Sequence, residues 1–136
     1  MWQRFLTYAN AGLGLAILRV IVGVAFTYHG AQKVFGIWGG HGIDGFAGYL
    51  DSLGLPLPVV QAWLAALAEF LGGLAFILGA FTRIAAVPLT VTMLVAIFLA
   101  HGGRYGESEH AINLLGGVIC IALAGPGCYA LHRKLR

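Results

Sequence analysis

The chain has 136 residues, of which 60% are hydrophobic and only 10% are charged. Soluble domains carry about 25% charged residues, so a mean hydropathy of +0.88 leaves too little polar sequence to cover a water-exposed surface. A soluble all-helical domain is therefore excluded. The net charge of +3 needs no nucleic acid to explain it. The composition predicts a small integral membrane protein.

Four apolar segments follow one another along the chain. Each approaches the roughly 20 residues that a helix needs to cross the hydrocarbon core of a bilayer. We expect transmembrane helices at about 13–35, 57–81, 84–101 and 110–127. The connections are short, so residues 1–136 should form a single domain, an all-α membrane protein with a four-helix up-down bundle. A cleaved signal peptide is disfavoured, because Arg19 interrupts the first apolar segment.

A further helical pattern lies in the loop between the first two segments. Its apolar residues are spaced i, i+3, i+4, i+7, and its acidic residues fall on the opposite face. The apolar residues are Ile43, Phe46, Ala47 and Leu50, and the acidic residues are Asp44 and Asp51. We expect a short interfacial helix that caps the bundle.

Basic residues mark one end of the expected bundle. The basic residues on the side of the termini are Arg4, Arg83, Arg133, Lys134 and Arg136. Most acidic residues fall on the opposite side. The positive-inside rule then places both termini in the cytoplasm and the 36–56 and 101–110 loops outside.

Glu69 lies in the middle of the second apolar segment, where an unpaired carboxylate would cost several kcal/mol. Its neighbours at i±3 and i±4 are alanines and glycines, so the carboxylate should face the bundle interior. Arg19 in the first segment is the expected partner, because counting from the helix ends separates the two by about 7–9 Å along the axis. We interpret the two residues as a structural ion pair or as a buried proton site.

A second set of polar residues lies at the opposite helix ends. Its members are His29, Gln32, Lys33, His101, Glu107, Glu109, His110 and Asn113. The candidate ligand-binding residues among them are His29, Lys33, His101, Glu109 and Asn113. Three interpretations remain open: ordinary polarity at the lipid headgroups, a metal site of His29, His101 and Glu109, or a quinone site in which the histidines and Lys33 bind the carbonyl oxygens. The aromatic residues that would line a quinone pocket are Phe26, Tyr28, Phe35 and Trp38.

Other cofactor chemistry has no signature in the sequence. No zinc-ligand, haem, flavin or nucleotide motif is apparent. Cys120 and Cys128 form no CxxC pair, and we interpret them as small apolar residues.

Six short motifs occur in order between about Leu15 and Tyr129. They are Leu18-Arg19, His29–Phe35, Ser52–Pro56, Glu69–Gly73, Gly79–Arg83 and Gly125–Gly127. In these motifs the chain resembles the DoxX family of small four-helix membrane proteins. After Gly127 it departs from the family, because Cys128 and Tyr129 stand where members often carry a serine and an aspartate.

The resemblance implies a multi-pass protein of the bacterial inner membrane, related to the DoxD subunit of thiosulfate:quinone oxidoreductase. It also implies association with redox enzymes. We therefore expect a quinone-linked redox component, or a subunit that works with a partner oxidoreductase in the bilayer. The alternatives are a non-catalytic scaffold that recruits soluble redox enzymes and, less favoured, a small transporter or metal-handling protein. The small-residue helix faces are compatible with a homo-oligomer.

Overall fold

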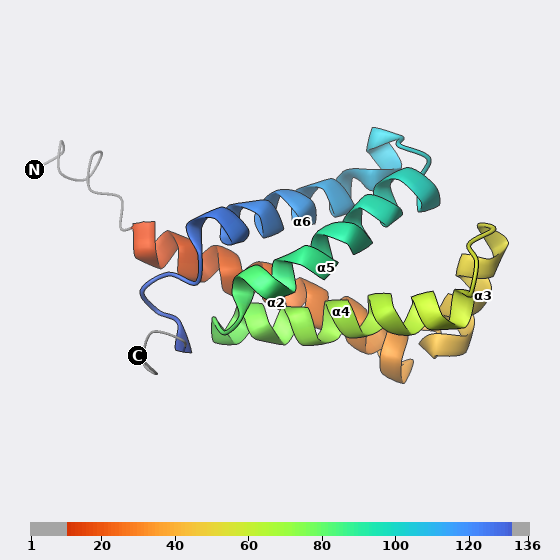
Figure 1. The fold of residues 1–136 in the computed structure, drawn as a ribbon, viewed down its shortest axis with the longest axis horizontal. Coiled ribbons are helices and arrows are strands. Elements are labelled where there is room, and N and C mark those ends of the chain that lie inside the picture. The colour runs from red at the N-terminus through yellow and green to blue at the C-terminus, as the bar shows by residue number, and fades with distance from the viewer. Residues whose placement is uncertain (1–10, 132–136) are drawn as a thin grey trace, which may run out of the picture.

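The computed structural model describes residues 11–131, and these residues form helices and connecting loops without a strand. The elements in chain order are α2 (Ala11–Phe35), α3 (Gly42–Ser52), α4 (Pro58–Leu78), α5 (Thr82–Val95), the π-helical turn η1 (Ala96–Ala100) and α6 (Tyr105–Ala124). Figure 1 shows the long helices side by side and α3 across one end of the bundle. We call that end the loop end, and the opposite end, where α2 begins and α6 ends, the terminal end.

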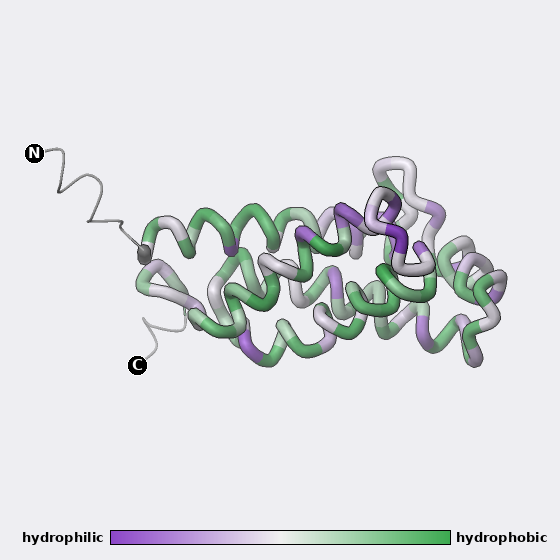
Figure 2. Tube along the Cα trace, turned by 90° about the horizontal axis from the view of Figure 1, so that it is seen from above, coloured by the Kyte–Doolittle hydropathy of each residue, from purple (hydrophilic) through white to green (hydrophobic). Residues whose placement is uncertain are grey.

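Within the part of the chain that the structure describes, four helices are long and apolar enough to cross a membrane. They cover Gly12–Phe35, Pro58–Leu78, Thr82–Ala100 and Tyr105–Ala124. Hydrophobic residues run along most of their length, and hydrophilic residues gather toward the loop end (Figure 2). The expected four-span membrane bundle is therefore confirmed. The fourth helix differs most from its expected range of 110–127, because it begins at Tyr105 and stops where Gly125 adopts a φ of 78°.

The four long helices pack as a ring in chain order. α2 packs most extensively against α4, α5 packs against both α4 and α6, and α6 closes the ring on α2. Glycines permit the closest approach: a Cβ on Gly30 of α2 would overlap the backbone of Phe70 in α4, and a Cβ on Gly73 would meet the backbone of Thr27. Small residues are the usual means by which membrane helices approach this closely.

The apolar core fills the ring between the helices. Its fully buried side chains include Phe26, Phe76, Leu89, Val118 and Ile121. Glu69 is buried among these groups, with 2% of its surface exposed. The prediction that the small-residue face of the second segment turns Glu69 into the bundle is confirmed.

The short helix α3 confirms the pattern seen in the sequence. Ala47 and Leu50 are buried against Ala62 of α4, whereas Asp44 and Asp51 are exposed. The helix is thus held by its apolar face over the loop end of the bundle.

The third span ends differently from the uniform helix expected. Its last turn, η1, is wider, and the amide of His101 donates to the carbonyl oxygen of Ala96 at 3.1 Å. Turns of this kind occur mostly as short interruptions of α-helices, and frequently at functional sites. Here the turn sets the direction in which His101 leaves the helix.

Candidate functional site

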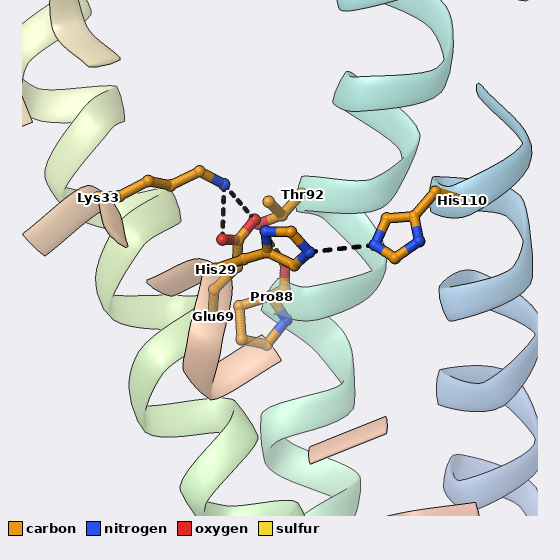
Figure 3. Close-up of polar contacts among 6 residues, drawn as sticks. All are labelled: His29, Lys33, Glu69, Pro88, Thr92 and His110. Atoms are coloured by element: carbon orange, nitrogen blue, oxygen red, sulfur yellow. Dashed lines mark hydrogen bonds and ion pairs between the residues drawn. The ribbon is translucent and has the colours of Figure 1, made fainter. Parts of the chain in front are cut away.

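The centre of the candidate site is an ion pair between α2 and α4. The Nζ atom of Lys33 lies 2.6 Å from Oε1 and 2.5 Å from Oε2 of Glu69 (Figure 3). The carboxylate is almost fully buried, whereas the Lys33 side chain is 25% exposed. The ammonium therefore neutralises the carboxylate and keeps partial access to the surroundings.

This pairing corrects the expected pair of Arg19 and Glu69. The guanidinium of Arg19 donates instead to two backbone carbonyl oxygens, Nη1 to Pro126 and Nη2 to Tyr129, the latter at 2.9 Å. Arg19 is buried, with 2% of its surface exposed. It ties α2 to the chain that follows α6 and takes no part in the site around Glu69.

The error came from counting inward from the helix ends. That count assumes that neighbouring helices begin and end at the same level. The glycine contacts instead place Gly30 beside Phe70 and Arg19 beside Gly79. Arg19 therefore lies about 16 Å from the level of Glu69, at 1.5 Å per residue.

A pair of histidines lies next to the ion pair. Nε2 of His29 in α2 is 3.1 Å from Nε2 of His110 in α6, so one ring donates a hydrogen bond to the other. Figure 3 places the His29 ring between the Lys33–Glu69 pair and His110. The sequence placed His110 in the same polar set as His29 but did not predict their contact, because nothing local to His110 shows that α6 brings it to α2.

A cavity of about 640 Å³ lies beside the carboxylate, between α4, α5 and α3. We call it the α4–α5 pocket. Its walls are largely apolar, with Leu64 and Ala68 from α4 and Val91 and Val95 from α5. Both members of the ion pair line it. Small-molecule sites have this character, since they are mostly apolar clefts with a few polar groups.

His101 supplies a further polar group to the α4–α5 pocket. It lines the cavity, and its Nδ1 atom is buried without a hydrogen-bond partner among the described residues. A buried polar atom without a partner costs about 1–3 kcal/mol. A ligand in the pocket that hydrogen-bonds to Nδ1 would remove this cost.

A smaller cavity of about 250 Å³ lies on the other side of Lys33, between α2 and α3. We call it the α2–α3 pocket. Its lining includes His29, Gln32 and His41, with glycines of the loop that leads into α3. The histidines predicted for one cluster are thus divided, with His29 in this pocket and His101 in the α4–α5 pocket.

Two of the predicted residues lie apart from these cavities. Glu109 and Asn113 are exposed on α6 and line neither pocket. Within residues 11–131, no group of three histidine, cysteine, aspartate or glutamate side chains is placed to hold a metal ion. The structure thus does not bring His29, His101 and Glu109 together as the metal alternative requires.

The aromatic lining also differs from the prediction. Phe26 is part of the core, and Tyr28 stacks on Trp38 with ring centroids 5.2 Å apart. Phe35 packs edge-on against Phe70. The aromatic residues that line the α4–α5 pocket are instead Phe46 and Tyr49 of α3.

Polar residues that the sequence analysis missed also line this pocket. Gln61 of α4 and Thr92 of α5 both contribute to its walls. Gln61 could have been noticed as a polar residue within an apolar segment. Thr92 offered no signal, because its hydroxyl donates to the carbonyl oxygen of Pro88, at 2.9 Å, as helical threonines often do.

The fold and the site define a small multi-pass membrane protein whose helices enclose a buried ion pair beside an apolar pocket. Comparison with known proteins agrees with this class. A sequence model of the DoxX family matches residues 14–102, and the chain belongs to this family. No solved structure gives a significant match.

Curated relatives match nearly the whole chain. An uncharacterized membrane protein of Mycobacterium tuberculosis is 30% identical, over 98% of this chain and 88% of its own length. Inner membrane protein YqjF of Escherichia coli is also 30% identical, over 90% and 92%. CatD of Bacillus subtilis, named provisionally as an oxidoreductase, is 32% identical over 88% and 84%.

Proposed function

We propose that this protein binds the head group of a quinone in the α4–α5 pocket and acts as a membrane redox component together with a partner oxidoreductase. The observation that carries the proposal is the meeting of one apolar cavity with Lys33, Glu69 and the unpaired Nδ1 of His101. The provisional name of CatD supports a redox role for the family.

The residues of the pocket fit a quinone in size and in chemistry. Ligand pockets commonly measure roughly 300–1,000 Å³, and this one measures about 640 Å³. Leu64 and Val91 line it and are themselves exposed within the two spans, so the pocket opens where hydrocarbon would surround the protein. A prenyl tail would leave by that opening. The Lys33 ammonium and the imidazole of His101 can donate hydrogen bonds to the carbonyl oxygens.

A bound quinone would supply two-electron, two-proton redox chemistry. The protein's own contribution is to orient the head group between His101 and Lys33, to exclude water with its apolar walls, and to hold a proton close by. The described residues offer no ligand set for a metal centre. The proposal therefore assigns the electron source to the partner.

Binding of decylubiquinone, a short-tailed quinone, to the purified protein in lipid nanodiscs tests the proposal. We expect about one quinone per chain, and we expect His101→Ala to weaken binding about tenfold, since losing one hydrogen bond worth about 1.4 kcal/mol has that effect. Asn113→Ala is the control, because Asn113 is a polar residue outside the pocket and should leave affinity unchanged.

Two results would contradict the proposal. One is wild-type protein that binds no quinone, and the other is His101→Ala protein that binds as tightly as wild type. Absence of quinone together with a co-purifying soluble enzyme would favour the scaffold alternative.

A further inference from the structure

Lys33 lies in the wall between two cavities. Among residues 11–131, three side chains line both the α2–α3 pocket and the α4–α5 pocket: Lys33, Phe46 and Tyr49. The Nζ atom of Lys33 lies 4.7 Å from the centroid of the Phe46 ring. The ammonium and two aromatic side chains of α3 therefore separate the cavities.

The two cavities differ in chemical character. The α2–α3 pocket is lined by His29, Gln32, His41 and backbone of the glycine-rich loop, all at the hydrophilic loop end. The α4–α5 pocket is lined mainly by apolar side chains of two spans. Glu69 lines this pocket and does not line the α2–α3 pocket. From the polar cavity to the apolar one, the order of groups is therefore the Lys33 ammonium and then the Glu69 carboxylate.

The interior formed by the described residues offers no comparable polar route toward the terminal end. Phe26, Phe76 and Leu89 fill the core there, and each is 0% exposed. Arg19, buried at that end, lies about 16 Å along α2 from the level of Glu69 and is bound to backbone carbonyl oxygens. Protons that reach the α4–α5 pocket through the described residues should therefore enter from the loop end.

We propose that Lys33 and Glu69 conduct protons from water in the α2–α3 pocket to a quinone in the α4–α5 pocket. This inference rests on the proposed function. Reduction of one quinone to its quinol consumes two electrons, which the partner oxidoreductase supplies, and two protons. Each proton passes from Lys33 Nζ to a carboxylate oxygen of Glu69 and from there to an oxygen of the head group. Lys33 then takes another proton from the α2–α3 pocket.

The route requires that Lys33 be reached from water at the loop end. The chain has only two lysines, Lys33 and Lys134, and Lys134 follows α6 in the sequence, on the side that the positive-inside rule assigns to the cytoplasm. A membrane-impermeant acetylating reagent should therefore modify Lys33 in sealed vesicles of one orientation and Lys134 in inverted vesicles. Bound decylubiquinone should slow modification of Lys33 several-fold and leave Lys134 unaffected. His41 lines the α2–α3 pocket and not the α4–α5 pocket. Labelling of His41→Cys by an impermeant maleimide therefore shows which vesicle orientation exposes the α2–α3 pocket to the reagent.

The protonation of Glu69 is read by infrared difference spectroscopy of the protein with bound decylubiquinone, poised oxidised and then reduced. We expect a carboxyl band that changes on reduction, is lost in Glu69→Gln and persists in Glu107→Gln, whose side chain is exposed. The route is overturned if quinone binds but Glu69→Gln keeps the band, or if Lys33 stays unmodified from the side that labels His41→Cys. Failure of wild-type protein to bind decylubiquinone overturns the proposed function itself, and the route with it.

Discussion

The Lys33–Glu69 ion pair lets a carboxylate lie inside a membrane span, where an unpaired charge would be costly. Glu69 is 2% exposed in the middle of a span, whereas Lys33 keeps a quarter of its side chain exposed. The two partners therefore depend on each other unequally. Without Glu69, the Lys33 ammonium can turn toward the polar α2–α3 pocket. Without Lys33, the Glu69 carboxylate stays buried with no cation beside it.

This inequality gives a prediction about unfolding free energy. Lys33→Met should cost about 3–5 kcal/mol, because it leaves a buried charge without compensation. Glu69→Leu should cost less, and the double variant Lys33→Met/Glu69→Leu should recover much of the loss, since replacing both members of a buried pair by apolar groups is often neutral. The measurement is reversible denaturation in detergent followed by circular dichroism. Additive losses in the double variant would show that the two side chains are not coupled.

Arg19 carries a second prediction at this scale. Its planar guanidinium donates to the carbonyl oxygens of Pro126 and Tyr129 at once, and a lysine lacks that fork. Arg19→Lys should cost about 1.5–3 kcal/mol, the worth of hydrogen bonds to a charged group. It should also speed amide hydrogen exchange in residues 125–131.

The control for Arg19 is Arg104→Lys. Arg104 is exposed and pairs with Glu107 at 3.0 Å on the surface of α6, where such pairs contribute about 0–1 kcal/mol. Equal losses of stability in the Arg19 and Arg104 variants would count against the tie between α2 and the chain after α6.

At the scale of elements, the contact of α2 with α4 fixes the register on which the site depends. Gly30 of α2 packs on the backbone of Phe70 in α4. Phe70 directly follows Glu69, and Gly30 lies three residues before Lys33. Any added bulk at Gly30 must push the helices apart where the ion pair joins them.

Gly30→Ala should therefore destabilise the bundle by about 1–3 kcal/mol, the usual cost of overpacking, and should weaken decylubiquinone binding. Gly14→Ala is the matched control in the same helix, because a Cβ there meets nothing within 4 Å; it should be neutral or slightly stabilising. Thermal unfolding in detergent compares the two. A Gly30→Ala protein as stable as Gly14→Ala would mean that α2 and α4 do not approach this closely.

The elements themselves could be predicted from sequence because their signals are local. Long apolar runs locate the spans, and the spacing of Phe46, Ala47 and Leu50 locates α3. The burial of Glu69 followed from its small neighbours, whose effect is also local. These signals need no knowledge of which helix lies beside which.

The partners of the site residues depend on register between helices, which no local signal reports. Lys33 was placed at a helix end and Glu69 at mid-span, yet the stagger of α2 against α4 brings them together. His110 reaches His29 only because α6 closes the ring. The apolar sequence of η1 likewise gives no signal of its wide turn, which sets the direction in which the chain continues to His101.

At the scale of the whole molecule, four spans return the chain to the side of the membrane on which it began. Arg83 lies in the first turn of α5 at the terminal end, whereas Asp44, Asp51 and Glu107 lie at the loop end. The positive-inside rule then predicts a cytoplasmic terminal end and an external loop end. Protons for the α4–α5 pocket would accordingly come from outside.

Cysteine labelling in intact cells tests this orientation. Gly48 is exposed on α3, with open space for a side chain, and Cys128 is exposed beyond α6. In a Cys120→Ala background, an impermeant maleimide should label Gly48→Cys in intact spheroplasts, whereas Cys128 should react only after the membrane is opened. The reverse pattern would invert the molecule, and the proton route would then draw on the cytoplasm. Labelling of both sites from outside would contradict the fold itself, because three spans, α4, α5 with η1, and α6, separate residues 48 and 128 and place them on opposite sides of the membrane.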